Sequence, residues 1–343
     1  HSIRRRQRQM CIRDRSIAWA CAERGARVQV VDPNGVGGRA SGGIVGALAP
    51  HVPENWNSKK AFQFDSLIMA KGFWESVENI GGVSSGYAQL GRIQPIMDTA
   101  SIELALKRSE SANDLWRGLA EWRVTAQEPE WGPASPTGYW IIDTLTARIN
   151  PMRACLALEA ALLAKGISVT QEAEDKGKVL WATGTHDLIH ISEELGKNFG
   201  SGIKGQAALF DLDRRHQPQV FADTLHFVPH EDGTLAIGST SEREYKTEHG
   251  VDDQLETLIA KARRIMPELA SARIIARWAA LRPRARSRAP IVGHHPVRKD
   301  AFIANGGFKI GFGMAPRLAM LMANLLLDGL NEIPEAFRPE TCL

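Results

Sequence analysis

The segment 16–32 constrains the fold of this chain more than any other part of the sequence. Its first half places apolar side chains on one face of a helix, at Ile17, Ala18, Ala20 and Cys21. Gly25 is suited to end that helix, and the valines after it make a short buried strand that stops at Asp32. A helix followed at once by a buried strand is the second half of a β-α-β unit. We therefore expect an α/β fold containing a parallel sheet.

The first half of that unit is absent from the sequence. In folds that bind dinucleotides it is an apolar strand followed by a GxGxxG turn, whose amides and helix dipole hold a pyrophosphate. Six arginines occupy residues 4–15 instead, and such a run cannot form the central strand of a parallel sheet, which is buried on both faces. What remains is Asp32, placed where an acid can hydrogen-bond a ribose hydroxyl. An ordinary turn aspartate is the alternative.

Residues 1–15 form an Arg-rich leader that does not resemble the rest of the chain. They contain six Arg and one Asp, a charge of +5, which leaves about −2 for residues 16–343. A basic arm can contact nucleic acid or a membrane surface, and it superficially resembles a targeting peptide. We expect instead a foreign or mistranslated leader, joined to a domain that lacks its first strand.

A glycine-rich loop follows the strand. Residues 34–51 read NGVGGRASGGIVGALAPH and hold six glycines around Arg39 and Ser41. Glycines let backbone amides approach a ligand closely, and an arginine can neutralise a phosphate. A surface linker is the alternative, but it would leave Ile44, Val45 and Leu48 exposed together. The loop is therefore a candidate binding segment.

Four stretches together resemble a known family. They are residues 32–51 (DPNGVGGRASGGIVGALAPH), 61–77 (AFQFDSLIMAKGFWESV), 278–293 (WAALRPRARSRAPIVG) and 302–316 (FIANGGFKIGFGMAP). Their order and spacing resemble the FAD-dependent D-amino acid oxidase superfamily, in particular its glycine oxidase and sarcosine oxidase-like members. The resemblance covers almost everything from Ser16 onward. The missing N-terminal strand and GxGxxG turn are the main departure from the family pattern.

The resemblance implies an α/β protein of two interleaved parts. One is a Rossmann-like FAD-binding domain, truncated at its N-terminus, over residues 16–84, 145–205 and 285–343. The other is an antiparallel-sheet α+β substrate domain over residues 85–144 and 206–284. Residues 151–166 predict a helix and 178–184 a strand, whereas the alternation in 224–240 around Asp232-Gly233 predicts a hairpin. The chain is short for this family between Gly166 and Lys178, so we assign no adenine contacts.

The resemblance also implies FAD-binding positions in the glycine-rich segments. They are Asp32, Arg39, Ala40, Ser41, Val45, Gly46, Ala47, Gly184, Gly306, Gly307, Phe308, Lys309, Ile310 and Gly311. Amides of 306–311 would lie against the flavin, and a helix beginning near Ala315-Pro316 would direct its positive end there. A glycine-rich turn ahead of a core helix is the alternative. No cysteine lies in this segment, so we expect FAD to be bound non-covalently.

Three positions are implied to act on the substrate. Arg282 matches the arginine that binds the substrate carboxylate, and a surface arginine is the alternative. Lys309 aligns with a second basic residue that is usually arginine, and a lysine cannot reproduce the planar guanidinium fork. His226 falls where related oxidases often have a tyrosine that helps bind the carboxylate, and a half-buried strand histidine is the alternative.

Composition and spacing argue against other kinds of protein. A chain of 343 residues with 43% hydrophobic and 24% charged positions is globular, with about two domains. Its four cysteines form no CxxC pair, so neither a zinc site nor a disulfide framework is indicated, and a reducing cytoplasm is the simplest location. His226 and His230 would lie roughly 13 Å apart on a strand, too far to share a metal ion. The apolar stretch 318–330 is too short to span a bilayer.

We therefore predict an FAD-dependent amino-acid or amine oxidase or dehydrogenase. Its substrate would be a small CH–NH or CH–NH2 donor such as glycine, sarcosine or a D-amino acid, with oxygen or a quinone as electron acceptor. An FAD-dependent tRNA-modifying oxidoreductase is an alternative, because residues 40–48 also resemble its ASGxxxGAL pattern. The nearly neutral charge of residues 16–343 argues against it, because an RNA-binding surface should be rich in Lys and Arg. We therefore expect no nucleic acid partner. A non-catalytic fragment is the other alternative, and a homo-oligomer is compatible with the sequence.

Overall fold

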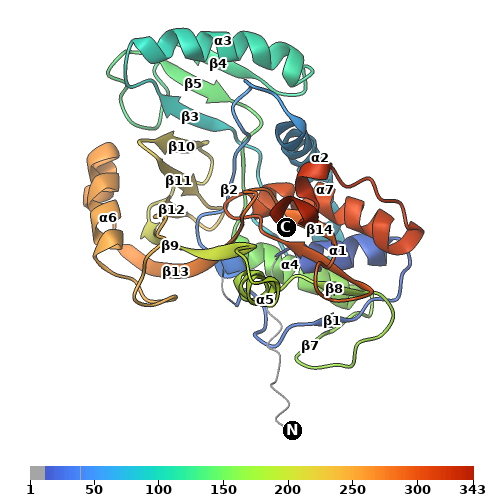
Figure 1. Cartoon of the computed structure of the whole chain (residues 1–343). Coiled ribbons are helices and arrows are strands. Elements are labelled where there is room, and N and C mark those ends of the chain that lie inside the picture. The colour runs from blue at the N-terminus through green and yellow to red at the C-terminus, as the bar shows by residue number, and fades with distance from the viewer. Residues whose placement is uncertain (1–11, 39) are drawn as a thin grey trace.

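The computed structural model describes residues 12–38 and 40–343, and residues 1–11 and Arg39 lie outside that description. The α-helices within the described ranges are α1 (Ile12–Glu23), α2 (Ser58–Gly81), α3 (Ala100–Leu115), α4 (Pro151–Ala164), α5 (Thr185–Leu195), α6 (Asp253–Ile265) and α7 (Gly311–Ala323). Figure 1 shows α3 and α6 beside a large sheet, and α1, α4 and α7 gathered around smaller ones. None of the described helices is long and apolar enough to cross a lipid bilayer.

The large sheet has eight strands in the order β13-β9-β12-β11-β10-β3-β5-β4. Their bounds are β3 (Arg92–Pro95), β4 (Trp122–Thr125), β5 (Trp140–Asp143), β9 (Gly200–Asp211), β10 (Gln219–Ala222), β11 (Leu225–Pro229), β12 (Thr234–Gly238) and β13 (Ile274–Ala285). Only the β10–β3 pair of this sheet is parallel. Phe227 on β11 lies opposite Ile237 on β12, which confirms the hairpin predicted over residues 224–240.

The smaller sheets include the parallel pairs expected from the β-α-β pattern. Their strands are β1 (Val30–Val31), β2 (Ala47–Leu48), β6 (Ala147–Arg148), β7 (Val169–Thr170), β8 (Val179–Trp181), β14 (Ile291–His294) and β15 (Ala301–Asn305). β1 runs parallel to β7 and β15 parallel to β8, whereas β2–β6 and β14–β15 are antiparallel. The strand predicted before Asp32 is β1, and the strand predicted over 178–184 contains β8.

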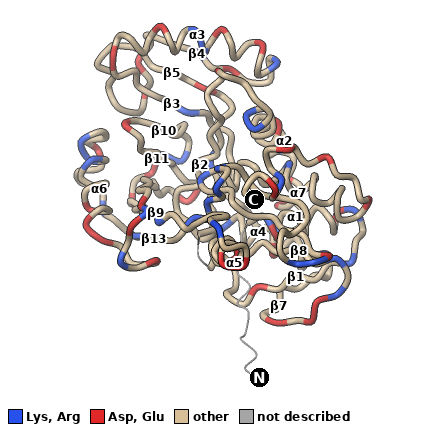
Figure 2. Tube along the Cα trace, in the orientation of Figure 1, with Lys and Arg blue, Asp and Glu red and all other residues tan. Residues whose placement is uncertain are grey.

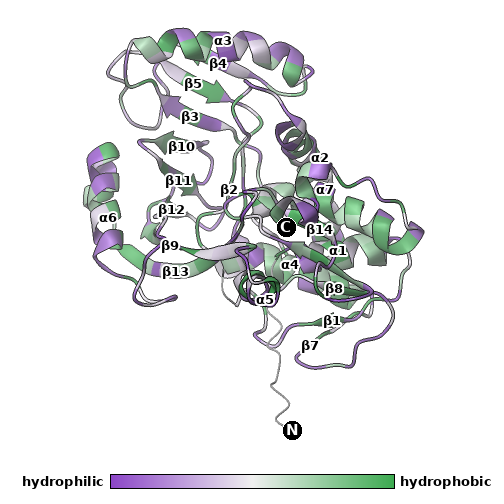
Figure 3. Cartoon of the chain, viewed as in Figure 1, coloured by the Kyte–Doolittle hydropathy of each residue, from purple (hydrophilic) through white to green (hydrophobic). Residues whose placement is uncertain are grey.

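Side-chain caps fix where α2 and α4 begin. Asn57 accepts a hydrogen bond from the amide of Lys60 at 3.1 Å, and Asn150 accepts one from the amide of Arg153 at 3.2 Å. Pro151 follows as the first residue of α4, where its missing N–H costs nothing. Figure 3 shows that α4 is strongly hydrophobic, and it packs with α1 and α2 in one core. The helix predicted over 151–166 is therefore confirmed.

Two helices begin earlier than the sequence suggests. α1 begins at Ile12, so residues 12–15 of the expected leader form its first turn, and the rest of that leader lies outside the described residues. The Ile12 amide donates to the Ser41 hydroxyl at 3.0 Å, which ties this turn to the glycine-rich loop. α7 begins at Gly311 rather than near Ala315, because the Ile310 carbonyl already accepts from the Met314 amide at 3.0 Å.

The large sheet and the smaller sheets draw on different parts of the chain. Strands of the large sheet come from residues 92–143 and 200–285, and strands of the smaller sheets come from the segments before, between and after them. This mixed α/β architecture has the predicted fold class. The division into domains at particular residues stays a prediction.

Candidate functional site

A cavity of about 420 Å³ lies between the large sheet and the helices around the smaller sheets. Its walls come from the loop 40–47, from β11 and β13, and from residues 308–312 at the start of α7. These segments are distant in sequence, and the fold brings them together. Ten of the residues predicted to bind FAD or substrate line this cavity: Ala40, Ser41, Val45, Gly46, Ala47, His226, Arg282, Phe308, Lys309 and Gly311.

Other predicted positions lie outside the lining of this cavity. Asp32 is buried, and Gly184 precedes α5 at the end of the β8 segment. Gly306, Gly307 and Ile310 belong to the turn before α7, and Gly307 pairs as an isolated bridge with Arg284. Arg39 cannot be placed, because it lies outside the described residues.

Arg282 extends from β13 into the cavity. Its Nη1 donates to the Thr240 carbonyl at 3.2 Å, and its Cζ lies 5.7 Å from the ring centroid of Trp278 on the same strand. Burial lowers the pKa of Arg282 to about 10, and the negative charge of Glu242 opposes that shift. The side chain therefore stays a cation at neutral pH, with further N–H donors for a ligand.

Lys309, in the turn before α7, and His226, on β11, line the same cavity. Burial, followed by the charge of Arg282, lowers the pKa of Lys309 to about 8. Burial lowers the pKa of His226 to about 3, and the charges of Arg92 and Lys309 add to this shift. His226 is therefore neutral at pH 7. Its Nδ1 has no hydrogen-bond partner within the described part of the chain.

The charges around the cavity are all of one sign. Arg13, Arg282 and Lys309 line it, and no Asp or Glu of the described residues does. Figure 2 shows the basic residues that gather near β2 and the ends of β9 and β13. A partly enclosed cavity lined by cations and by no described carboxylate attracts anions.

Gly46 allows the glycine-rich loop to run along the cavity. This residue has φ +68°, and a Cβ on it would lie 1.7 Å from the Ile149 carbonyl oxygen. The loop is fixed further by the Ile149 amide, which donates to the Gly46 carbonyl at 2.9 Å, and by the ring of His230, which bonds the Ile44 carbonyl at 2.8 Å. The segment is therefore an ordered wall rather than a linker.

The turn before α7 forms another wall of the cavity. The Phe308 amide donates to the Pro283 carbonyl at 2.9 Å, which joins the turn to the strand that carries Arg282. Phe308 itself has φ +44°. Gly311 and Phe312, the first residues of α7, line the cavity. The positive end of the helix dipole therefore faces the site.

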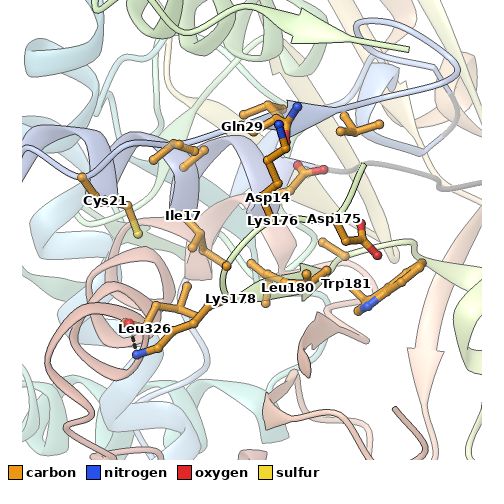
Figure 4. A pocket seen from close by; sticks show the side chains of 18 of the residues that line it. Asp14, Ile17, Cys21, Gln29, Asp175, Lys176, Lys178, Leu180, Trp181 and Leu326 are labelled. Atoms are coloured by element: carbon orange, nitrogen blue, oxygen red, sulfur yellow. Dashed lines mark hydrogen bonds between the residues drawn. The ribbon is translucent and has the colours of Figure 1, made fainter. Parts of the chain in front are cut away.

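A second cavity of about 350 Å³ lies on the other side of the first turn of α1. Figure 4 shows side chains that line it from α1, from the segment leading into β1 and from the segment around β8, including Cys21, Gln29 and Trp181. Lys178 at its edge donates to the Leu326 carbonyl at 2.6 Å. Ile12 and Arg13 line the first cavity and Asp14 and Ile17 the second, so α1 begins between the two.

The residues between the two cavities suit an anionic group. Arg13 is 3% exposed, and its Nε and Nη1 have no hydrogen-bond partner among the described residues. A Cβ on Gly307 would lie 2.1 Å from Nη2 of Arg13, so the glycine makes room for this guanidinium. Asp32, predicted to bind a ribose hydroxyl, accepts a hydrogen bond from Arg15 at 2.9 Å, and its role towards a ribose stays a prediction. The FAD implied by the resemblance therefore fits at its flavin and pyrophosphate parts, whereas the acid assigned to the ribose is paired with a side chain of the protein.

Sequence reasoning missed several residues that line the site. Trp278 was within reach of prediction, because it lies four residues before Arg282 on one strand and thus on the same face. Phe221 packs against His226 with ring centroids 4.7 Å apart, but this contact depends on the pairing of β10 with β11. Arg13 was assigned to the leader, and no signal in the sequence placed it in a binding site.

Comparison with known proteins gives a consistent result. The chain matches the family described as FAD dependent oxidoreductase over residues 15–325. It is 25% identical over 366 residues to a glycine oxidase of Pseudomonas putida, with 94% of each chain covered. It is also 25% identical over 332 residues to a bifunctional protein ThiO/ThiG of Synechocystis sp., where the match covers 89% of this chain and 48% of that relative. The chain thus spans about half the length of that relative. The crystal structure of iminodiacetate oxidase from Chelativorans sp. BNC1 shares the fold, with a TM-score of 0.83 and 18% identity over 96% of this chain and 97% of that one.

Proposed function

The chain belongs to the family of FAD dependent oxidoreductases, and on that premise we propose that it oxidises the C–N bond of a small amino acid with a free carboxylate. Glycine and N-substituted glycines such as sarcosine are the preferred substrates, since a relative similar over nearly its whole length is a glycine oxidase. Iminodiacetate, which gives one structural neighbour its name, is also an N-substituted glycine. The observation that carries the proposal is a cavity with Arg282 and Lys309 and no acidic residue in its described lining.

Arg282 and Lys309 bind the substrate carboxylate in this proposal. A guanidinium fork that holds a carboxylate through two charge-assisted hydrogen bonds contributes about 1.5 to 3 kcal/mol in a dry site. Lys309 adds a second positive charge without the planar geometry. Together they fix the acid end of the substrate, so that its α-carbon is held at a constant place in the cavity.

The same cations act on the substrate amine. Positive charges nearby lower the pKa of a bound ammonium, and the described lining offers it no carboxylate. The neutral amine, with the lone pair that imine formation needs, is thereby favoured. His226 is uncharged at neutral pH, and its Nδ1, which has no hydrogen-bond partner among the described residues, can accept an N–H of that amine.

When bound, FAD supplies the hydride acceptor that converts the CH–NH group of the substrate to an imine, which water then hydrolyses. The chain would hold the flavin with the loop 43–47 and with Phe308 and Gly311, and the pyrophosphate with Arg13. Gly311 and Phe312, the first residues of α7, line the cavity, so the positive end of the helix would stabilise negative charge there.

Anaerobic reduction of the bound flavin tests this proposal. The chain is reconstituted with FAD, freed of oxygen, and mixed separately with glycine, sarcosine, iminodiacetate and D-alanine. We expect the visible flavin absorption to bleach with at least one of the glycine compounds, with release of ammonia or an amine. Recovery of the band with oxygen, or only with a quinone, then distinguishes an oxidase from a dehydrogenase. Failure to retain FAD, or no bleaching with any compound, would refute the proposal in favour of a non-catalytic chain.

A further inference from the structure

Gly205 lies in the middle of β9, beneath the guanidinium of Arg282. A Cβ on Gly205 would lie 1.7 Å from Nη1 of Arg282, 2.0 Å from its Cζ and 2.2 Å from its Nη2. The three nearest heavy atoms to that Cβ all belong to this one guanidinium. The charged group therefore occupies the volume that the side chain of any other residue at position 205 would take.

The strand register explains this contact. Arg282 on β13 lies opposite Ile203 on β9, and Gly205 is two residues further along β9 on the same face. The long arginine side chain runs diagonally across that face and ends over Gly205. Nothing in the backbone requires glycine there, because its φ is outside the left-handed region. A glycine inside a strand usually weakens the strand, so the space it leaves is the physical reason for its presence.

Thr240 fixes the orientation of the same guanidinium. Its carbonyl accepts from Nη1 of Arg282 at 3.2 Å. Thr240 is itself held on both sides by Gln206, since the Thr240 amide donates to the Gln206 carbonyl at 3.2 Å and the Gln206 amide donates to the Thr240 hydroxyl oxygen at 2.8 Å. The acceptor that orients Arg282 is thus part of the backbone ladder beside Gly205.

A buried network supports this ladder from behind. Glu242 accepts a hydrogen bond from the Gln206 side chain at 2.9 Å, and its other oxygen lies 3.7 Å from the ammonium of Lys204. Lys204 is fully buried and donates to Asp252 at 2.8 Å. The two acids offset the two cations, Lys204 and Arg282, and the guanidinium stays charged although it is desolvated.

We propose that Gly205 is a positioning residue for carboxylate recognition, because its missing side chain sets the place of the Arg282 guanidinium in the cavity. The inference deepens the proposed function and rests on it, since it concerns the substrate carboxylate that Arg282 binds. A side chain at position 205 displaces the guanidinium from Thr240 and from the carboxylate. Selectivity for carboxylates therefore depends on a residue that need not touch the substrate.

The test is Gly205→Ala in the FAD-loaded protein, with acetate as a carboxylate probe. Acetate binding is measured by its perturbation of the flavin absorption, and thermal stability and FAD content are measured on the same samples. We expect the Kd of acetate to rise at least about tenfold. The melting temperature and FAD content should stay unchanged, since the atoms that give way are the end of a flexible side chain. With a carboxylate substrate, KM should rise while kcat at saturation changes little.

A double variant and a control make the result specific. If Gly205 acts through Arg282, adding Gly205→Ala to Arg282→Ala weakens acetate binding no further. Gly72→Ala is the matched control, because Gly72 is exposed on α2 and a Cβ there meets nothing within 4 Å. This control should bind acetate like the unchanged protein.

The outcomes separate the inference from the function on which it rests. Equal acetate binding by the unchanged protein and by Arg282→Ala would refute the carboxylate role of Arg282. Weaker binding by Arg282→Ala together with normal binding by Gly205→Ala would overturn the role of Gly205. If Gly205→Ala alone does not fold, a folded double variant supports the inference, because removing the guanidinium frees the space, and an unfolded double variant overturns it.

Discussion

Replacing Arg282 with alanine removes the group on which carboxylate binding depends most. The guanidinium of Arg282 provides charge-assisted hydrogen bonds to the substrate carboxylate, and their loss costs about 1.5 to 3 kcal/mol. This free energy corresponds to a rise of about 10- to 150-fold in the KM of a carboxylate substrate. The protein should still fold, because Glu242 keeps its hydrogen bond from Gln206 and the ammonium of Lys204 at 3.7 Å. Lys309 also stays in the cavity, so some affinity for the carboxylate is retained.

Steady-state kinetics with glycine or sarcosine measure this effect, and FAD content is determined in parallel. Arg277→Ala is the control, because Arg277 lies on the opposite face of β13 and pairs with Glu256 at 3.1 Å. We expect KM to change less than about threefold for this exposed pair, whose ion-pair energy is small. An unchanged KM in Arg282→Ala, with flavin still bound, would remove Arg282 from the substrate site.

Substitutions at three further positions test the site and the residues that support it. Burial lowers the pKa of Lys309 to about 8, so carboxylate affinity should fall as pH rises through about 8, and Lys309→Arg should abolish that fall in acetate titrations. The pKa of Lys309 in the folded protein is below the ordinary value of 10.5 that applies to the unfolded chain. The charged lysine therefore lowers the free energy of unfolding below about pH 8, and this cost disappears as the pH rises from about 8 to 10.5. Lys309→Met removes the charge, so this variant should melt at a higher temperature at pH 7. Gly46→Ala should lower the free energy of unfolding in urea by about 3 kcal/mol, because φ is +68° and the Cβ would meet the Ile149 carbonyl at 1.7 Å. Asp143→Ala should cost about 3 to 5 kcal/mol in the same assay, since it leaves buried Arg92 without the carboxylate that it contacts at 2.8 Å; a loss below about 1 kcal/mol would contradict the importance of that pair.

Local patterns in the sequence predicted much of the fold. The helix before Gly25, the short strand ending at Asp32 and the hairpin over 224–240 follow from apolar periodicity and turn residues, which need no knowledge of distant contacts. The convergence of Arg282, Lys309 and His226 in one cavity could not be derived from periodicity. It was expected only because the surrounding stretches resemble a family.

Features that depend on register or on buried charge were not predictable from the sequence. The role proposed for Gly205 depends on the pairing of β9 with β13, which places Gly205 under Arg282, 77 positions away in the sequence. Arg15 belongs to an arginine run that reads as exposed, because burial of a charge is costly without a partner. The structure supplies that partner in Asp32, which the sequence had assigned to a ribose.

The most direct test of the account compares two substrates that differ only in the carboxylate. Sarcosine and dimethylamine share the same secondary amine, so anaerobic reduction of the bound FAD by each reports on the contribution of Arg282 and Lys309. The account predicts that sarcosine reduces the flavin with a second-order rate constant at least about 100-fold higher, the equivalent of about 3 kcal/mol of carboxylate binding. Equal rate constants for the two amines would contradict it, because the cations of this cavity would then play no part in recognition.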